Sequence, residues 1–341
     1  PASILDRRQE TGTPGWWRAP NGSGPFRVRE VGEDRLTLER SERWAAAPVA
    51  LPSVHVRLGA AASQPENLYQ AGEVDLVPDV APQLVPLIQD PASRIPVGSL
   101  IEVTRFSLAY IAFGNRRPPL DDAHVRRALQ RVFPASRIAE ATYEGRVLPA
   151  TGIVPPGMLG EAWPAELPPH DVSAARAEIA RSRYGRAEAA PPIRIHAADI
   201  SPVEALREVA ERELGLRIEA VQVNWFDFLN GLAARRWDAY SLLWGADYPD
   251  PEAFLGVLFG SDSSENYTGY TNPAVDAALA AARGEPDAQR RRQAYIRAQQ
   301  LLIDDGAVIP LYVPRGYTLA RPGIDEVPVT SMGLQGLEAI R

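Results

Sequence analysis

The sequence contains no cysteine and no lysine. Without cysteine the chain can form no disulfide, no thiolate nucleophile and no zinc site built on thiolates. All 36 basic residues are arginine, and proline is abundant at 32 of 341 residues. A GC-rich codon usage would explain both features. A hot or harsh working environment is the alternative, because proline in loops lowers the entropy of the unfolded chain.

Long apolar runs and familiar catalytic motifs are also missing. The sequence has no apolar run of the roughly 18 residues that a membrane-spanning helix needs. It lacks the G-x-S-x-G, H-E-x-x-H and G-x-x-x-x-G-K-[ST] patterns. The four histidines are scattered without the spacing of metal ligands, at positions 55, 124, 170 and 196. We therefore expect no enzyme activity, no metal site and no cofactor.

The charge balance and the length narrow the class further. Forty-three acidic residues against 36 basic ones give a net charge of −7, which argues against a nucleic-acid partner and against a polybasic membrane surface. A chain of 341 residues is long enough for about two domains. It begins at Pro1 without the features of a signal peptide, so we expect either a removed leader or a fragment.

The first third of the chain has the pattern of a mixed α+β region. Residues 26–31 and 36–39 alternate around a Gly-Glu-Asp turn and predict a β-hairpin. Residues 107–113 are apolar and aromatic, which predicts a buried strand. The pattern changes at Asn115, after which long helices with clear capping residues follow.

Residues 193–244 carry the clearest architecture. Strands are predicted at 193–197, 216–221 and 239–244, with helices between them. The first of these helices is expected to start with a capping box at residues 201–204. This β-α-β-α-β order predicts a parallel sheet.

Ligands of open α/β sheets bind beyond the carboxyl ends of the strands. The third predicted strand leads into Trp244-Gly-Ala-Asp247-Tyr248-Pro-Asp250-Pro251. Asp250 is expected to cap the following helix, whereas Asp247 lies where no cap is needed and is a candidate ligand contact. A catalytic pair of Asp247 and Glu252, as in glycoside hydrolysis, is only weakly indicated. The three arginines within residues 289–292 are expected to form a solvated helix face.

Five segments, in order along the chain, resemble the family 5 extracellular solute-binding proteins, which are the oligopeptide- and dipeptide-binding receptors of bacterial ABC importers. The matching segments are Gly22-Ser-Gly-Pro-Phe26 with the hairpin after it, Leu68 to Leu76, Pro118 to Leu129, Trp244 to Leu255, and Gly269-Tyr-Thr-Asn-Pro273.

The resemblance implies an α/β, periplasmic-binding-protein-like fold of type II, with two lobes that trap the ligand between them. Residues 1–112 with 314–341 would form lobe one, and residues 113–313 lobe two. Family members usually carry a further stretch before Gly22, so the N-terminal part of lobe one and a small extra domain would be missing here. A lipid anchor in that stretch would be the only membrane attachment.

The function implied is capture of a peptide or related small solute outside the cytoplasm, with delivery to the permease subunits of an ABC transporter. The alternative is a ligand-sensing domain of a cytoplasmic transcription regulator, since some regulators carry the same module. Other members of the family bind nickel, sugars or glutathione.

The resemblance also assigns site residues. In peptide-binding members the acid at the position of Asp247 holds the α-ammonium of the peptide, and Trp244 and Tyr248 would flank it. The full set of expected ligand-binding residues is Asp247, Trp244, Tyr248, Tyr267 and Tyr270. Some members carry an arginine that recognises the ligand carboxylate, where this chain has Ser241.

Overall fold

The computed structural model describes residues 22–160, 162–334 and 336–341. It divides into two compact units, one formed by the residues up to 103 together with 316–341 (unit 1), and the other by residues 104–315 (unit 2). The boundary expected at residue 112 falls inside a strand that belongs wholly to unit 2. That the two units act as the two lobes of a receptor stays a prediction.

The sheet of unit 2 has the strand order β11-β6-β10-β8-β9, and β7 also pairs with β11. Its strands are β6 (Ser107–Phe113), β7 (Val147–Pro149), β8 (Ile193–Ala197), β9 (Ile218–Gln222), β10 (Ala239–Gly245) and β11 (Val308–Ala320). Strands β9, β8 and β10 are parallel, as predicted. Strand β6 is antiparallel to both β10 and β11.

Five of the described α-helices of unit 2 begin at a side-chain cap. Asp122, Asp171, Asn224, Asn272 and Asp287 each accept a hydrogen bond from a backbone N–H in the first turn of the helix that follows. The helices are α4 (Ala123–Val132), α5 (Ala135–Tyr143), α6 (Val172–Arg181), α7 (Ser201–Leu214), α8 (Trp225–Ala233), α9 (Gly256–Phe259), α10 (Pro273–Gly284) and α11 (Ala288–Asp304), with 3-10 turns η4 (Met158–Gly160), η5 (Ala187–Ala189) and η6 (Pro251–Ala253).

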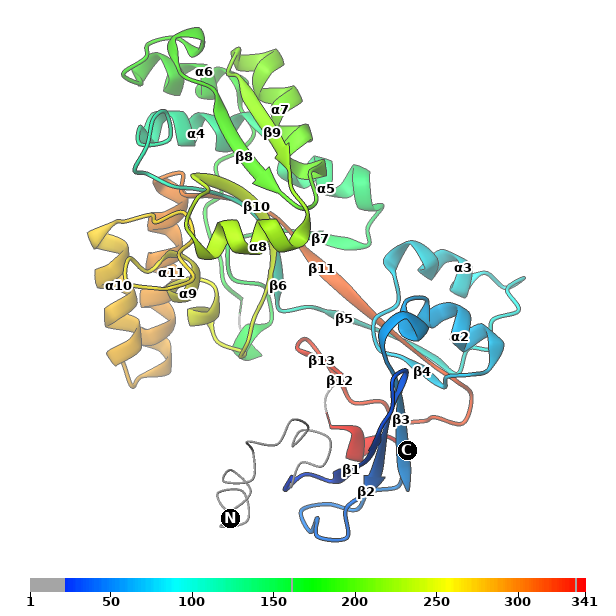
Figure 1. The fold of residues 1–341 in the computed structure, drawn as a ribbon. Coiled ribbons are helices and arrows are strands. Elements are labelled where there is room, and N and C mark those ends of the chain that lie inside the picture. The colour runs from blue at the N-terminus through cyan, green and yellow to red at the C-terminus, as the bar shows by residue number, and fades with distance from the viewer. Residues whose placement is uncertain (1–21, 161, 335) are drawn as a thin grey trace. The chain divides into compact units, whose positions relative to one another are not determined.

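Strand β6 shows how the sheet is buried on both faces. Leu108, Tyr110 and Ala112 belong to one apolar cluster, together with residues of α8, α9, α10 and α11. The alternate residues Ala109, Ile111 and Phe113 belong to a second cluster with α4, α6 and α7. Helices thus cover both faces of the sheet, as Figure 1 shows, and the period of two along the strand sorts its side chains between them.

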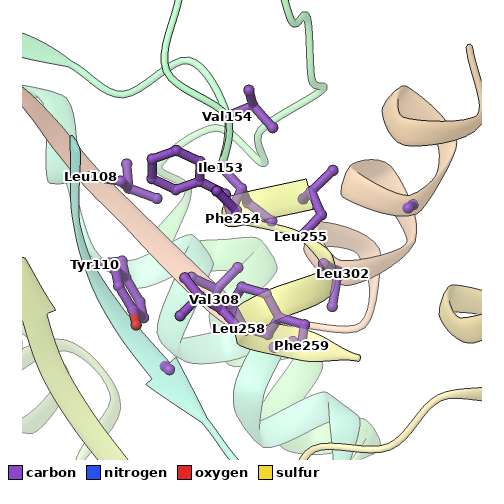
Figure 2. Close-up of a cluster of buried hydrophobic side chains, with 14 of the residues drawn as sticks. Leu108, Tyr110, Ile153, Val154, Phe254, Leu255, Leu258, Phe259, Leu302 and Val308 are labelled. Carbon is purple, nitrogen blue, oxygen red and sulfur yellow. The ribbon is translucent and has the colours of Figure 1, made fainter. Parts of the chain in front are cut away.

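The first cluster anchors the segment that follows β10. Figure 2 shows Phe254, Leu255, Leu258 and Phe259 packed with side chains such as Leu108. All four residues of this segment are at most 2% exposed. The loop between β10 and α9 is therefore attached to the core at its far end as well as at the strand.

Unit 1 contains a three-stranded antiparallel sheet and the pairing of β4 and β5 with β11. The predicted hairpin is confirmed, with Phe26 opposite Arg40 and Val31 opposite Leu36. The elements are β1 (Phe26–Val31), β2 (Arg35–Arg40), β3 (Ser53–Arg57), β4 (Leu76–Val77), β5 (Ser99–Thr104), β12 (Val329–Thr330), β13 (Gly333–Leu334), α2 (Pro65–Ala71), α3 (Val85–Gln89), η2 (Gly59–Ala62), η3 (Pro82–Leu84) and η7 (Leu337–Ala339).

The capping box expected at the start of α7 is wrong in its details. Ser201 is already the first helical residue, and its backbone N–H donates to Asp199 Oδ1 at 3.0 Å. Glu204 does not reach back to the helix start but accepts a hydrogen bond from Arg207 Nε at 2.7 Å. The helix ends, as expected, at Gly215, whose φ of 74° favours glycine.

Candidate functional site

The loop after β10 begins at the carboxyl end of a parallel strand, where the sequence predicted it. Strand β10 ends at Gly245, and the N–H of Ala246 still donates to the carbonyl of Phe106 at 2.8 Å. Asp247 and Tyr248 follow and are exposed, Tyr248 by 42%. The tip of the loop therefore presents a carboxylate and a phenol ring on the surface of unit 2.

The inner part of this loop is held by the helical pair α10 and α11. Asp250 caps η6 through the N–H of Glu252, and both of its carboxylate oxygens accept hydrogen bonds from Arg291 Nη2, at 2.9 and 2.8 Å. Glu252 accepts from Arg283 at 2.6 and 2.9 Å. The cap expected at Asp250 is confirmed.

Tyr295 lies at the centre of this network. Its hydroxyl accepts from Arg291 and donates to Glu252 Oε2, both at 3.1 Å. Burial, and next the Glu252 carboxylate, raise the pKa of Tyr295 well above its ordinary value, so the hydroxyl stays protonated and keeps donating. The expectation that residues 289–292 form a solvated face is wrong for Arg291, whose side chain is 28% exposed and ion-paired.

Asp247 differs from its neighbours in the loop. Its carboxylate accepts no hydrogen bond from any described residue, and no ion pair involves it within the described chain. It therefore does not order the loop in the way that Asp250 does. An exposed carboxylate on a loop fixed from both sides is available to a cationic group without a competing internal partner.

The aromatic residues of the expected site have different surroundings. Trp244 is half-buried, and its indole N–H donates to the carbonyl of Ala253 at 2.9 Å, which fixes the ring. Tyr267 is half-buried, donates to the Glu265 carboxylate and packs edge-on against Tyr240. The structure thus places Trp244, Asp247 and Tyr248 in one loop, whereas Tyr267 lies on the separate segment between α9 and α10.

Tyr270 is a correction to the expected site. It is 0% exposed, its hydroxyl donates to Asp305 Oδ2 at 2.8 Å, and Asn272 Nδ2 donates to that hydroxyl at 3.1 Å. Burial, followed by the Asp305 carboxylate, raises its pKa. Tyr270 therefore stabilises the interior of unit 2 through these hydrogen bonds, and its side chain has no exposed surface that a ligand could contact.

A pocket in unit 2 was missed by the sequence analysis. It has a volume of about 360 Å³ and lies where the chain leaves β8, with walls from β6, β10, β11 and the starts of α7 and α8. Its lining includes Asp199, Trp225, Phe228, Ser241, Leu243 and Tyr312. Trp225 and Leu243 are more than half exposed, which is unusual for such large apolar side chains.

The strand order explains why a pocket forms there. Strand β8 lies between β9 and β10 in the sheet. The chain runs from β8 through α7 on one face to β9, and then returns through α8 on the opposite face to β10 (Figure 1). When the connections that follow two neighbouring strands lie on opposite faces of the sheet, a crevice opens at the carboxyl ends of these strands. The β-α-β-α-β pattern contained this signal, but the spatial order of the strands was needed to locate the crevice.

His196 lies on β8, next to this edge of the sheet. Its ring stacks on Trp237 with the ring centres 3.8 Å apart and the planes at 18°. Burial is the largest cause that lowers the pKa of His196, and a backbone hydrogen bond at Ala239 opposes it. The histidine is therefore neutral at physiological pH and contributes packing rather than charge.

Two features typical of other protein classes are missing from the part of the chain that the structure describes. Within residues 22–341, apart from the two undescribed positions, no cluster of three or more histidine, aspartate or glutamate side chains is arranged to bind a metal ion. In the same part of the chain, no helix combines the length and apolarity of a transmembrane span.

Residues 3–266 match the family described as "Bacterial extracellular solute-binding proteins, family 5 Middle". The chain is 25% identical to "Probable di/tripeptide-binding protein 5" of Pseudomonas aeruginosa, over 99% of this chain and 65% of that protein. It is 26% identical to "Periplasmic oligopeptide-binding protein OppA" of Escherichia coli, over 90% of this chain and 58% of that protein. The chain therefore spans less than two thirds of the length of these relatives.

Among solved structures, the chain is similar to the "ABC Transporter Substrate Binding Protein CtaP" of Listeria monocytogenes, with a TM-score of 0.85. The match covers 100% of this chain and 70% of that protein, at 19% sequence identity. At that identity the likeness establishes the fold, which confirms the predicted α/β, periplasmic-binding-protein-like class.

Proposed function

The chain belongs to the bacterial extracellular solute-binding proteins of family 5, and on that premise we propose that it binds a peptide through its free ammonium group. The ligand would be captured outside the cytoplasm and passed unchanged to the permease of an ABC importer. Binding, rather than catalysis, is the proposed activity. Capture between two lobes, with closure around the ligand, stays a prediction.

One observation carries the proposal, namely the carboxylate of Asp247. It is exposed, has no partner among the described residues, and follows Trp244, whose ring is fixed by Ala253. The network of Asp250, Arg291 and Glu252 holds the loop below it. A preorganised carboxylate loses little freedom on binding and forms a charge-assisted hydrogen bond to an ammonium group.

The relatives support a peptide as the ligand. The two proteins of Pseudomonas aeruginosa and Escherichia coli reported above are named as peptide-binding. Nothing among these relatives supports the alternative of a domain from a transcription regulator. The partner we propose is accordingly a transporter permease rather than DNA.

Native mass spectrometry can test the ligand class. The 341-residue chain would be incubated with an equimolar panel of tetraalanine, N-acetyl-tetraalanine, glutathione, maltose and nickel chloride. We expect an adduct of the mass of tetraalanine, with the acetylated peptide retained to a much smaller extent. Retention of only sugar or nickel, or of both peptides equally, would contradict the proposal.

A further inference from the structure

The pocket beside β8 has a simple electrostatic character. Asp199 is the only charged residue among the described residues that line it, and neither arginine nor histidine contributes to its walls. Asp199 is exposed, and one of its oxygens accepts from the N–H of Ser201 at 3.0 Å. Its second oxygen remains available, so the pocket offers a negative group and no positive one.

The remaining walls are largely apolar. Trp225 and Leu243 are 51% and 53% exposed, whereas Phe228, a further lining residue near the Trp225 ring, is fully buried. Tyr312 pairs its hydroxyl with that of Tyr143 at 3.0 Å. Ser241, which is 8% exposed, occupies the position at which some family members carry a carboxylate-binding arginine. With serine at this position, that arginine does not add a positive charge to the pocket. Apolar walls and one carboxylate match a ligand group with an apolar stem and a cationic head.

We propose that this pocket binds a cationic side chain of the captured ligand, of the lysine or arginine kind, and disfavours a carboxylate. This inference rests on the proposed function, because the side chain is taken to belong to the peptide whose ammonium group meets Asp247. It makes the chain selective for basic peptides at one position.

The strand register indicates which position that is. Tyr240 lies opposite His196 in the parallel pair, and continuing this register places Asp199 level with Leu243. Asp247 is four residues farther along the chain, which corresponds to about 13 Å at the rise of a β-strand. An extended peptide has a similar rise per residue, so we expect the basic side chain about three to four residues from the ammonium group.

The inference can be tested by calorimetric titration with pentaalanine and with pentaalanine carrying one lysine or one glutamate at each position in turn. At the fourth or fifth position we expect lysine to bind at least about tenfold more tightly than glutamate, equal to about 1.4 kcal/mol. Asp199→Asn keeps the acceptor for Ser201 and should abolish most of this preference. Glu208→Gln removes one exposed negative charge from α7 outside the pocket, and should leave the preference unchanged.

The outcomes separate this inference from the proposed function. Peptides that bind without a lysine preference at any position, or with a preference that Asp199→Asn leaves intact, would overturn the inference alone. If no peptide binds, the pocket is tested directly with n-pentylamine and pentanoate. Binding of each probe would be followed by the fluorescence of Trp225, and variants substituted at Trp225 would serve as the control. Pentylamine binding that Asp199→Asn weakens would support the pocket assignment, and equal or absent binding of the two probes would overturn it.

Discussion

Asp247 and Asp250 lie three residues apart in one loop, yet they differ in every contact that the structure gives them. Asp250 caps η6 and receives Arg291, whereas Asp247 is exposed and accepts no hydrogen bond from a described residue. The same division holds for the tyrosines of the expected site, since Tyr248 is 42% exposed and Tyr270 is fully buried. Acidic and aromatic residues of the expected site thus serve either the interior or the surface.

This difference shows how a binding loop can be both rigid and available. Arg283 and Arg291 bind Glu252 and Asp250, the inner acids of the loop. The loop gains its rigidity from these inner pairs, so its outer carboxylate needs no internal partner. A ligand ammonium group can therefore bind without breaking an existing ion pair.

The largest effect on stability is expected from Arg291→Ala. It removes a partly buried ion pair and the hydrogen bond to Tyr295, so the free energy of unfolding should fall by about 2 kcal/mol, below the value for a fully buried pair. Urea unfolding followed by circular dichroism would measure it. Arg290→Ala is the matched control, since Arg290 is exposed and pairs with Glu285 in solvent; equal losses for the two variants would contradict the role given to the network.

A second comparison uses the two tyrosines. Tyr270→Phe removes a hydroxyl that donates to Asp305 and accepts from Asn272, so we expect a loss of about 1–2 kcal/mol in unfolding free energy with unchanged ligand affinity. Tyr248→Phe removes an exposed hydroxyl and should cost less than about 0.5 kcal/mol. Thermal unfolding and ligand titration of both variants would check this. A Tyr270→Phe protein of normal stability and weakened binding would return Tyr270 to the binding site.

The smallest effect concerns pH and His196. Burial lowers its pKa in the folded state, so the unfolded chain, with a histidine pKa of about 6.5, binds the proton more readily. The stability from the neutral ring is therefore complete above pH 6.5 and is lost as the pH falls through that value toward the folded pKa. The unfolding free energy of the unmodified chain should fall between pH 7.5 and pH 5.5. In His196→Gln we expect this fall to be smaller, by less than about 1 kcal/mol.

A His196→Gln protein whose unfolding free energy falls between pH 7.5 and 5.5 as steeply as that of the unmodified chain would contradict the burial of a neutral ring against Trp237.

Local patterns in the sequence predicted much of the fold. The apolar run of residues 107–113, the cap at Asp250 and the β-α-β-α-β order each depend on neighbouring residues, and the structure confirms them. Strand β11 runs from Val308 to Ala320. Its second half is specified by pairing with the distant strand β4, which no local pattern reveals.

The candidate site was predictable to a smaller extent. The loop position of Asp247 followed from one strand, and the capping role of Asp250 from its sequence context. The pocket at Asp199 could not be found in this way, because Ala109, Trp225, Leu243 and Tyr312 come together only through the order of the strands. For the same reason the burial of Tyr270 was missed, since its partner Asp305 lies 35 residues away.

The central claim is that Asp247 receives a ligand ammonium group, and a double-substitution cycle tests it most directly. Tetraalanine and N-acetyl-tetraalanine would each be titrated calorimetrically against the unmodified chain and against Asp247→Asn. A desolvated charge pair that loses one partner costs about 3–5 kcal/mol, so Asp247→Asn should weaken the free peptide by at least about a hundredfold. The acetylated peptide should lose much less. Equal losses for both peptides would contradict the claim, because a defect in the loop cannot distinguish a free amino terminus from a blocked one.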